Sequence, residues 1–140
     1  TGTERPIVFN REVHTVTNHA VTNGRNANEL VEVVATFTGT AFRGSEPVQP
    51  ILVFGPGRQS WMPEEYWEFE PDTPRLDVSG WYQGAVAEIG DGRLAFFGEA
   101  AMFTAQVFDN GNVRAGMNSP LAEDNAQLLL NVVHWLSRVY

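Results

Sequence analysis

Short apolar runs, separated by glycine, proline and polar turns, recur along most of the chain and predict strands rather than helices. In the longest run, residues 30–42, successive side chains alternate between two faces, and Val31, Val33 and Ala35 share one of them. The valine and threonine content of this run also favours a strand. Gly39 near its end predicts a bulge or a close approach of another backbone segment. Shorter runs that predict further strands are residues 7–9, 51–54, 85–89 and 93–97.

Turn residues connect these runs. Gly-Asp-Gly at residues 90–92 lies between the last two runs and predicts a β-hairpin. Asp-Asn-Gly-Asn at residues 109–112 predicts a second turn. Residues 14–19 alternate in the manner of a strand, whereas residues 98–106 predict the beginning of a short helix.

One long helix is predicted at the end of the chain. Ser119 is a good capping residue, and Pro120 suits the first helical position because its missing N–H costs nothing there. Glu123 and Asp124 place negative charge in the first turn, which the helix dipole favours, and Arg138 lies in the last turn. The apolar residues that predict one buried face are Ala122, Ala126, Leu129, Val133 and Leu136, and Leu128, Leu130, Val132 and Trp135 broaden that face.

Residues 59–75 differ from the rest because aromatic and acidic side chains are interspersed with prolines. We predict an ordered excursion with one helical turn at residues 63–66, since long loops inside compact domains are often functional. Indole and phenol rings stack on sugar faces and on apolar ligands while keeping a polar atom exposed. The candidate ligand-binding residues are therefore Trp61, Tyr66, Trp67, Trp81 and Tyr82. The alternative is that these rings plug the core or pack against another part of the protein.

Composition narrows the classes of function. The chain has 140 residues, enough for one domain with a core, and it is acidic, with a formal net charge of −8. All nine basic residues are arginines and lie singly along the chain, so we expect no nucleic-acid partner. No apolar run approaches the roughly 20 residues of a membrane span, so we expect a soluble protein without a membrane partner. The absence of cysteine excludes a disulfide framework, a thiol nucleophile and a cysteine metal site, and it leaves the compartment open.

Glu99 is the first candidate for catalysis, because it follows a predicted buried strand and a glycine. A carboxylate at a strand end acts as an acid, a base or a cation ligand; the alternative is that it stabilises the start of a helix near Ala100. His19 and Asn118 are candidate partners of Glu99 in a hydrolase or lyase site. His14 and His19 are five positions apart and would face opposite sides of a strand, so we predict no metal site from them.

Five segments carry a resemblance to a known superfamily: residues 19–25 (HAVTNGR), 35–42 (ATFTGTAF), 92–103 (GRLAFFGEAAMF), 116–118 (GMN) and 125–136 (NAQLLLNVVHWL). In these segments the chain resembles the C-terminal half of the class I glutamine amidotransferase-like superfamily, and bacterial proteins of that fold in particular. The resemblance implies a Rossmann-like α/β sheet with a β-hairpin and a long C-terminal helix, in which an acidic residue lies at the carboxyl edge of the sheet. The catalytic cysteine of that superfamily has no counterpart here, so the resemblance implies no amidotransferase chemistry.

We therefore expect residues 1–140 to form a single domain or the C-terminal portion of a larger domain, and the start at Thr1 indicates a processed or partial chain. The preferred hypothesis is a non-catalytic domain of glutamine amidotransferase-like ancestry that binds a small polar ligand, a carbohydrate or a partner. One alternative is a hydrolase or lyase that uses Glu99. Another is a structural half of a larger assembly, completed by a missing N-terminal half or by a second copy of the chain. The sequence names no cofactor and no substrate.

Overall fold

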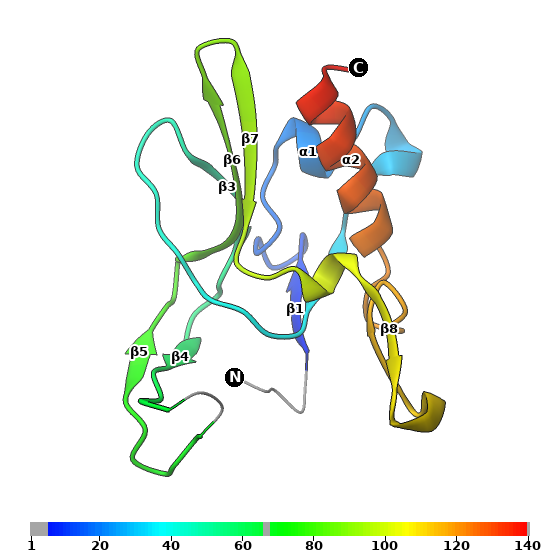
Figure 1. Cartoon of the computed structure of the whole chain (residues 1–140). Helices are drawn as coiled ribbons and strands as arrows, with labels where there is room; N and C mark the ends of the chain where they lie inside the picture. Colours follow the sequence, from blue (N-terminus) through cyan, green and yellow to red (C-terminus); the bar gives the residue numbers. More distant parts are fainter. Residues whose placement is uncertain (1–5, 66–67, 140) are drawn as a thin grey trace.

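The structure is a computed structural model and describes residues 6–65 and 68–139. Its strands are β1 (Ile7–Asn10), β2 (Val33–Thr36), β3 (Gln49–Val53), β4 (Gln59–Trp61), β5 (Arg75–Asp77), β6 (Tyr82–Ile89), β7 (Gly92–Phe97), β8 (Ala105–Phe108) and β9 (Val113–Gly116). Its α-helices are α1 (Ala20–Asn23) and α2 (Asn125–Ser137), and single turns of 3₁₀ helix lie between some elements. The described chain is therefore rich in sheet with one long C-terminal helix, which agrees with the predicted α/β class (Figure 1).

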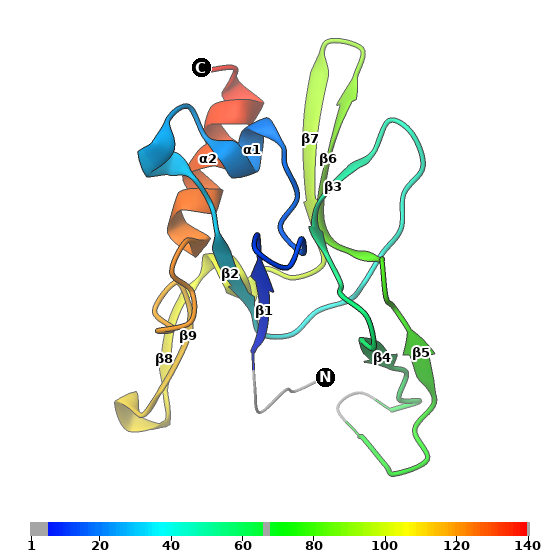
Figure 2. The same ribbon diagram turned by 180° about the vertical axis from the view of Figure 1, so that it is seen from behind.

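The strands form several small antiparallel sheets rather than one large sheet. β1 pairs with β2, β6 lies between β3 and β7, β4 pairs with β5, and β8 pairs with β9. The β4–β5 and β8–β9 hairpins project as two separate arms from the body that the other elements form (Figures 1 and 2). Every ladder within residues 6–65 and 68–139 is antiparallel, so the parallel pairing of a Rossmann-like sheet does not occur there.

Three of the local predictions are confirmed. The predicted hairpin consists of β6 and β7, whose ladder closes with Ile89 opposite Gly92. The strand predicted from the apolar run at residues 51–54 corresponds to β3, in which Ile51 and Leu52 are fully buried. The first apolar run forms β1. These elements share a core with both helices, and its largest buried apolar side chains include Phe9, Ile51, Leu52, Met102 and Leu128.

The strand predicted over residues 30–42 is much shorter in the structure, because β2 spans only Val33–Thr36. Its sole strand neighbour within the described part is β1, which lies along one edge. Along the other edge, the side chains of Asp124, Asn125 and Glu99 bind the backbone of β2 and of the residues that flank it. Side chains thus take the place of a further strand, and regular pairing ends at Thr36.

Two of these side chains come from the start of α2. The carboxylate of Asp124 accepts a hydrogen bond from the Val33 N–H at 2.9 Å. The side-chain amide of Asn125, which is fully buried, accepts from the Ala35 N–H at 2.9 Å and donates to the Ala35 carbonyl at 2.8 Å. The same amide also donates to the Met102 carbonyl at 2.9 Å. Asn125 therefore joins α2 to two other segments of the chain.

The predicted start of this helix at Pro120 is wrong, because α2 begins at Asn125. Ser119 accepts a hydrogen bond from the Leu121 N–H at 3.3 Å within a turn and does not cap the helix. Asp124 occupies the N-cap position but makes no side-chain capping bond, since its carboxylate binds β2 instead.

The buried face of α2 also differs from the prediction. Leu128, Val132 and Trp135, which the prediction gave as broadening the face, are buried together with Asn125 and Asn131, whereas Ala126, Val133 and Leu136 from the predicted face are exposed. The cause is that polar side chains belong to the buried face. Asn131 donates to the carbonyl oxygens of Val21 and Glu29, at 2.9 and 2.8 Å, and so fixes α2 to the α1 region.

Three further predictions of local structure are not confirmed. Residues 14–19 do not form a regular strand, because they turn into α1 and His14 has a φ of 60°. The short helix expected after residue 98 is a single 3₁₀ turn, Ala101–Phe103. Residues 63–65 are not helical, and Tyr66, the last residue of the predicted turn, lies outside the described residues.

The buried amide of Asn125 predicts a large stability effect. Asn125→Ala should lower the free energy of unfolding by about 3 kcal/mol, because it leaves buried backbone groups of Ala35 and Met102 without partners. Urea denaturation followed by tryptophan fluorescence measures the change. Asn118→Ala is the matched control, since Asn118 makes one exposed hydrogen bond of 3.4 Å, and it should change the value by less than about 0.5 kcal/mol. Equal effects of the two variants would contradict this role of Asn125.

Candidate functional site

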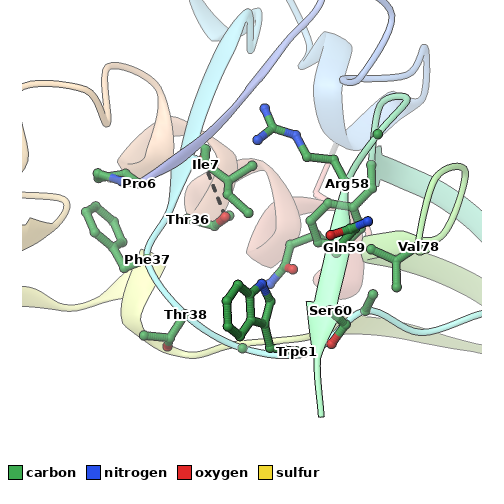
Figure 3. A pocket seen from close by; sticks show the side chains of 15 residues that line it. Pro6, Ile7, Thr36, Phe37, Thr38, Arg58, Gln59, Ser60, Trp61 and Val78 are labelled. Atoms are coloured by element: carbon green, nitrogen blue, oxygen red, sulfur yellow. Dashed lines mark hydrogen bonds between the residues drawn. The ribbon is translucent and has the colours of Figure 1, made fainter. Parts of the chain in front are cut away.

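A cleft of about 410 Å³ opens between the β1–β2 sheet and the β4–β5 arm. Figure 3 shows Ile7, Thr36 and Phe37 on one side of the cleft and Arg58 and Ser60 on the other. This volume lies in the range of small-molecule sites in proteins. The cleft is therefore the candidate site, and the segments that form its walls determine what it binds.

Glu99 holds one wall of the cleft in place without lining the cleft itself. Its carboxylate accepts hydrogen bonds from the Phe37 N–H at 3.0 Å, the Thr38 N–H at 2.6 Å and the Thr38 hydroxyl at 3.3 Å. Phe37 and Thr38 both line the cleft. Glu99 follows β7 at a strand end, as the sequence indicates. The prediction that this strand is buried is wrong, because the side chains of β7 are exposed or half-buried. The oxygens of Glu99 are engaged by the chain's own donors. Its observed role is to position the wall.

Two glycines allow this wall to lie against the end of β7. Gly39 has a φ of 104°, and a Cβ at this position would collide with the Gly98 carbonyl. A Cβ on Gly98 would in turn collide with the carbonyl oxygen of Thr40, whose N–H donates to the Gly98 carbonyl at 3.0 Å. The close backbone approach predicted at Gly39 is thus confirmed.

The opposite wall comes from β4 and the turn before it. The Arg58 carbonyl accepts a hydrogen bond from the Val78 N–H at 2.9 Å, whereas the exposed Arg58 guanidinium makes no hydrogen bond or ion pair with the described residues. Trp61 is held more firmly. The Arg75 guanidinium lies 4.0 Å from the centroid of its ring, and Phe69 packs against it edge-on with centroids 6.0 Å apart. This wall therefore presents a cation and an indole fixed in orientation.

Gln83 of β6 contributes a buried amide to the same cleft. Its backbone carbonyl accepts from the Gly98 N–H at 2.8 Å, which fixes its position at the end of the β6–β7 ladder. The side chain lines the cleft although the residue is only 1% exposed. Its amide nitrogen has no hydrogen-bond partner among the described residues. Buried side-chain donors are nearly always paired, so we expect this nitrogen to bind an acceptor outside the described residues.

The aromatic candidates are not gathered in one place. Of those in the described part, Trp61 lines the cleft and the others do not. The ring of Trp81 packs under an arginine guanidinium 4.0 Å from its centroid, and Tyr82 packs edge-on against a phenylalanine with centroids 6.0 Å apart. Tyr66 and Trp67 lie outside the described residues. Trp61 is therefore the aromatic residue on which the candidate site depends.

His19 serves as the cap of α1. Its ring Nδ1 accepts a hydrogen bond from the Val21 N–H at 3.1 Å, and the backbone N–H of His19 donates to the Thr22 hydroxyl at 3.0 Å. Burial lowers the pKa of His19, so the ring is neutral at neutral pH and carries its proton on Nε2. The ring packs edge-on against Trp135, with centroids 5.5 Å apart, in a second hollow of about 370 Å³.

The hydrogen bonds of the three predicted catalytic residues go to other parts of the chain. No hydrogen bond in the described part joins any two of Glu99, His19 and Asn118. The side-chain amide of Asn118 donates to the Gln106 carbonyl at 3.4 Å, between β8 and the loop after β9. Each of the three residues therefore binds backbone groups of its own neighbourhood.

Other kinds of site find little support. Among residues 6–65 and 68–139, no group of three or more histidine, cysteine, aspartate or glutamate side chains could hold a metal ion. None of the described helices is both long and apolar enough to cross a membrane. Of the residues that line the cleft in the described part, Arg58 alone has an ionisable side chain.

Comparisons with protein-family models, with curated proteins and with solved structures found no match for the chain. The glutamine amidotransferase-like origin therefore stays a prediction from the sequence. The functional conclusion has to come from the cleft and its side chains.

The sequence analysis did not identify Gln83 or Arg58 as site residues. The sequence contains a signal for Gln83 but none for Arg58. Gln83 is a polar residue at the start of an otherwise apolar strand, and such a residue is either turned to solvent or buried for a reason. Arg58 follows a Gly-Pro-Gly turn, but nothing in the local pattern separates it from the other scattered arginines.

The burial of Glu99 predicts a pH-dependent stability. Burial raises the pKa of Glu99 above its ordinary value of 4.5, and the N–H groups of Thr38 and Phe37 offset this only in part. A carboxyl group with a higher pKa in the folded state binds its proton more tightly when folded, so stability falls as the pH rises from the unfolded pKa through the folded pKa. We expect Glu99→Gln to remove this part of the decline.

Urea denaturation of the wild type and of Glu99→Gln at several values between about pH 4 and pH 7 tests this expectation. The wild type should lose stability relative to the variant as the pH rises, because the titration of all other groups cancels in the difference. Glu123→Gln, at an exposed position, is the control for removing a charge. If both variants change the pH dependence of the free energy of unfolding in the same way, the burial of Glu99 does not cause the decline in stability.

Proposed function

We propose that this chain is a non-catalytic binding domain and that it holds a small polar ligand in the cleft between the β1–β2 sheet and the β4–β5 arm. The observation that carries the proposal is the amide of Gln83, which is buried, lines the cleft and has an unpartnered nitrogen. A buried donor without an acceptor costs about 1–3 kcal/mol. A ligand oxygen that reaches this nitrogen from the cleft would remove this cost.

The other lining groups support binding rather than catalysis. The described part of the lining contains hydroxyl, amide, indole and guanidinium groups but no carboxylate and no imidazole. General acid–base catalysis needs a group that gains and loses a proton near the working pH, and arginine does not do so. The cleft therefore has groups to orient a ligand, and its described lining has no carboxylate or imidazole for general acid–base catalysis.

The hydrolase or lyase alternative has less support. It requires Glu99 to act on a substrate, but the Glu99 carboxylate is bound by the Phe37 and Thr38 N–H groups and does not line the cleft. His19 lies in a different hollow, where its Nδ1 caps α1. This alternative stays a prediction from the sequence.

A partner-binding function is favoured by one separate observation. The outer side of α2 exposes apolar side chains at helical spacing, because Leu130, Val133 and Leu136 are 52%, 51% and 40% exposed. This pattern fits the hypothesis of a structural half within a larger assembly. Descent from a glutamine amidotransferase-like ancestor is compatible with either function and is needed for neither.

The proposed role of Gln83 predicts that removing its amide raises the stability of the fold but abolishes ligand binding. Gln83→Leu should raise the free energy of unfolding by about 1–3 kcal/mol, because it removes an unpaired buried donor at similar side-chain volume. The same change should abolish ligand binding in the cleft. Gln106→Leu, at an exposed position of β8, should leave both properties nearly unchanged.

Thermal or urea denaturation measures the stability of both variants. Binding is followed in ¹H–¹⁵N spectra by the shift of the Trp61 indole N–H, with D-glucose, benzoate and benzamide as separate probes. At least one probe should shift this resonance in the wild type and in Gln106→Leu but not in Gln83→Leu. A Gln83→Leu variant that is less stable and binds unchanged would overturn the proposed role of the amide.

A further inference from the structure

We propose that the ligand of the cleft is an organic anion, a carboxylate attached to a flat ring, which Arg58 and Gln83 bind by its oxygens and Trp61 by its ring. This inference rests on the proposed binding function and specifies its ligand class. It follows from the charge of the cleft, the direction of its hydrogen bonding and the rigidity of one wall.

The charge of the cleft is opposite to that of the whole protein. The chain has a formal net charge of −8, yet the ionisable residue that lines the described part of the cleft is the cationic Arg58. The carboxylate of Glu99, which contacts one wall from behind, is already bound by the N–H groups of Phe37 and Thr38. A cation without neighbouring carboxylates in the lining favours an anionic ligand.

Arg58 is available for this role. Its side chain is exposed, and the described residues offer its guanidinium no ion pair and no hydrogen bond. Two other arginines, by contrast, lie over indole rings: Arg43 over Trp81 and Arg75 over Trp61, each at 4.0 Å from the ring centroid. A guanidinium presents a planar set of N–H donors that matches the two oxygens of a carboxylate.

The unsatisfied group of the cleft is a donor, which also favours a carboxylate. The amide nitrogen of Gln83 lacks an acceptor, and a carboxylate is an acceptor with two oxygens and no donor of its own. A sugar hydroxyl both accepts and donates, and the described lining offers it neutral amide and hydroxyl oxygens but no carboxylate as an acceptor. Carbohydrate, which the aromatic residues of the sequence also suggest, is therefore the weaker candidate.

The flat part of the ligand follows from Trp61. Its indole lines the cleft; the Arg75 guanidinium lies over one face of the ring, and the ring of Phe69 packs nearly at right angles to it. Apolar side chains of Phe37 and Phe54 line the same space. A ring fixed in advance loses little entropy when a planar ligand stacks on it, so an aromatic carboxylate gains most from this wall.

Paired probes test the charge and the ring separately. Phenylacetate and phenylacetamide have nearly the same shape and differ in charge, acetate lacks the ring, and D-glucose represents the carbohydrate alternative. Each is titrated into the wild type, Arg58→Gln, Arg58→Lys and Arg114→Gln, with the Trp61 indole N–H shift as the readout. Arg114 is an exposed arginine of β9 that does not line the cleft, so Arg114→Gln controls for the loss of one positive charge.

We expect the wild type and Arg114→Gln to bind phenylacetate at least about tenfold more tightly than phenylacetamide, acetate or D-glucose, a difference of about 1.4 kcal/mol. Arg58→Gln should remove the preference for phenylacetate over phenylacetamide, and Arg58→Lys should retain part of it because the charge remains. Raising the salt concentration should weaken phenylacetate and leave phenylacetamide unchanged.

Two kinds of failure are distinguishable. If phenylacetamide or D-glucose binds as tightly as phenylacetate, or if Arg58→Gln binds phenylacetate like Arg114→Gln, the anionic class is wrong while the binding function stands. If none of the four probes shifts the Trp61 resonance at millimolar concentration, both the ligand class and the proposed function are overturned.

Discussion

The unpaired edge of β2 is the constraint on which the rest of the structure depends. A strand with a neighbour on one side leaves alternate N–H and C=O groups of its backbone to be satisfied by something else. Asp124, Asn125 and Glu99 satisfy these groups in turn over residues 32–38. Because Asp124 and Asn125 stand at the start of α2 and Glu99 follows β7, this edge fixes the helix and the hairpin relative to the same strand.

The cleft is a consequence of that arrangement. Glu99 binds the backbone immediately after β2, and the glycines at 39 and 98 let this segment lie close to the end of β7. The wall formed by Phe37 and Thr38 is therefore held by the carboxylate and not by a strand partner. The β4–β5 arm forms the other wall. Gln83 of the β6–β7 hairpin lines the cleft between these two walls.

The sequence predicts those features that depend on neighbouring residues and fails where distant backbone needs a partner. The β6–β7 hairpin, the buried strand at Ile51 and the close approach at Gly39 follow from turn residues and apolar runs, and the structure contains each of them. The start and the buried face of α2 do not follow from its apolar pattern. Asn125 and Asn131 are buried because β2 and the α1 region lack backbone partners, and a periodicity of apolar residues cannot reveal that need.

The candidate site shows the same division, and it explains why the binding proposal rests on an amide rather than on a carboxylate. Glu99 attracts attention in the sequence because a carboxylate after a buried strand is a common catalytic arrangement. In the fold, the carboxylate of Glu99 accepts hydrogen bonds from the backbone N–H groups of Phe37 and Thr38. Gln83 does not stand out in the sequence. Its buried, unpaired nitrogen nevertheless lowers the stability of the fold, and an apolar residue at this position would avoid that cost. A group that weakens the fold and faces a cleft is most simply explained by the ligand that completes its hydrogen bonding.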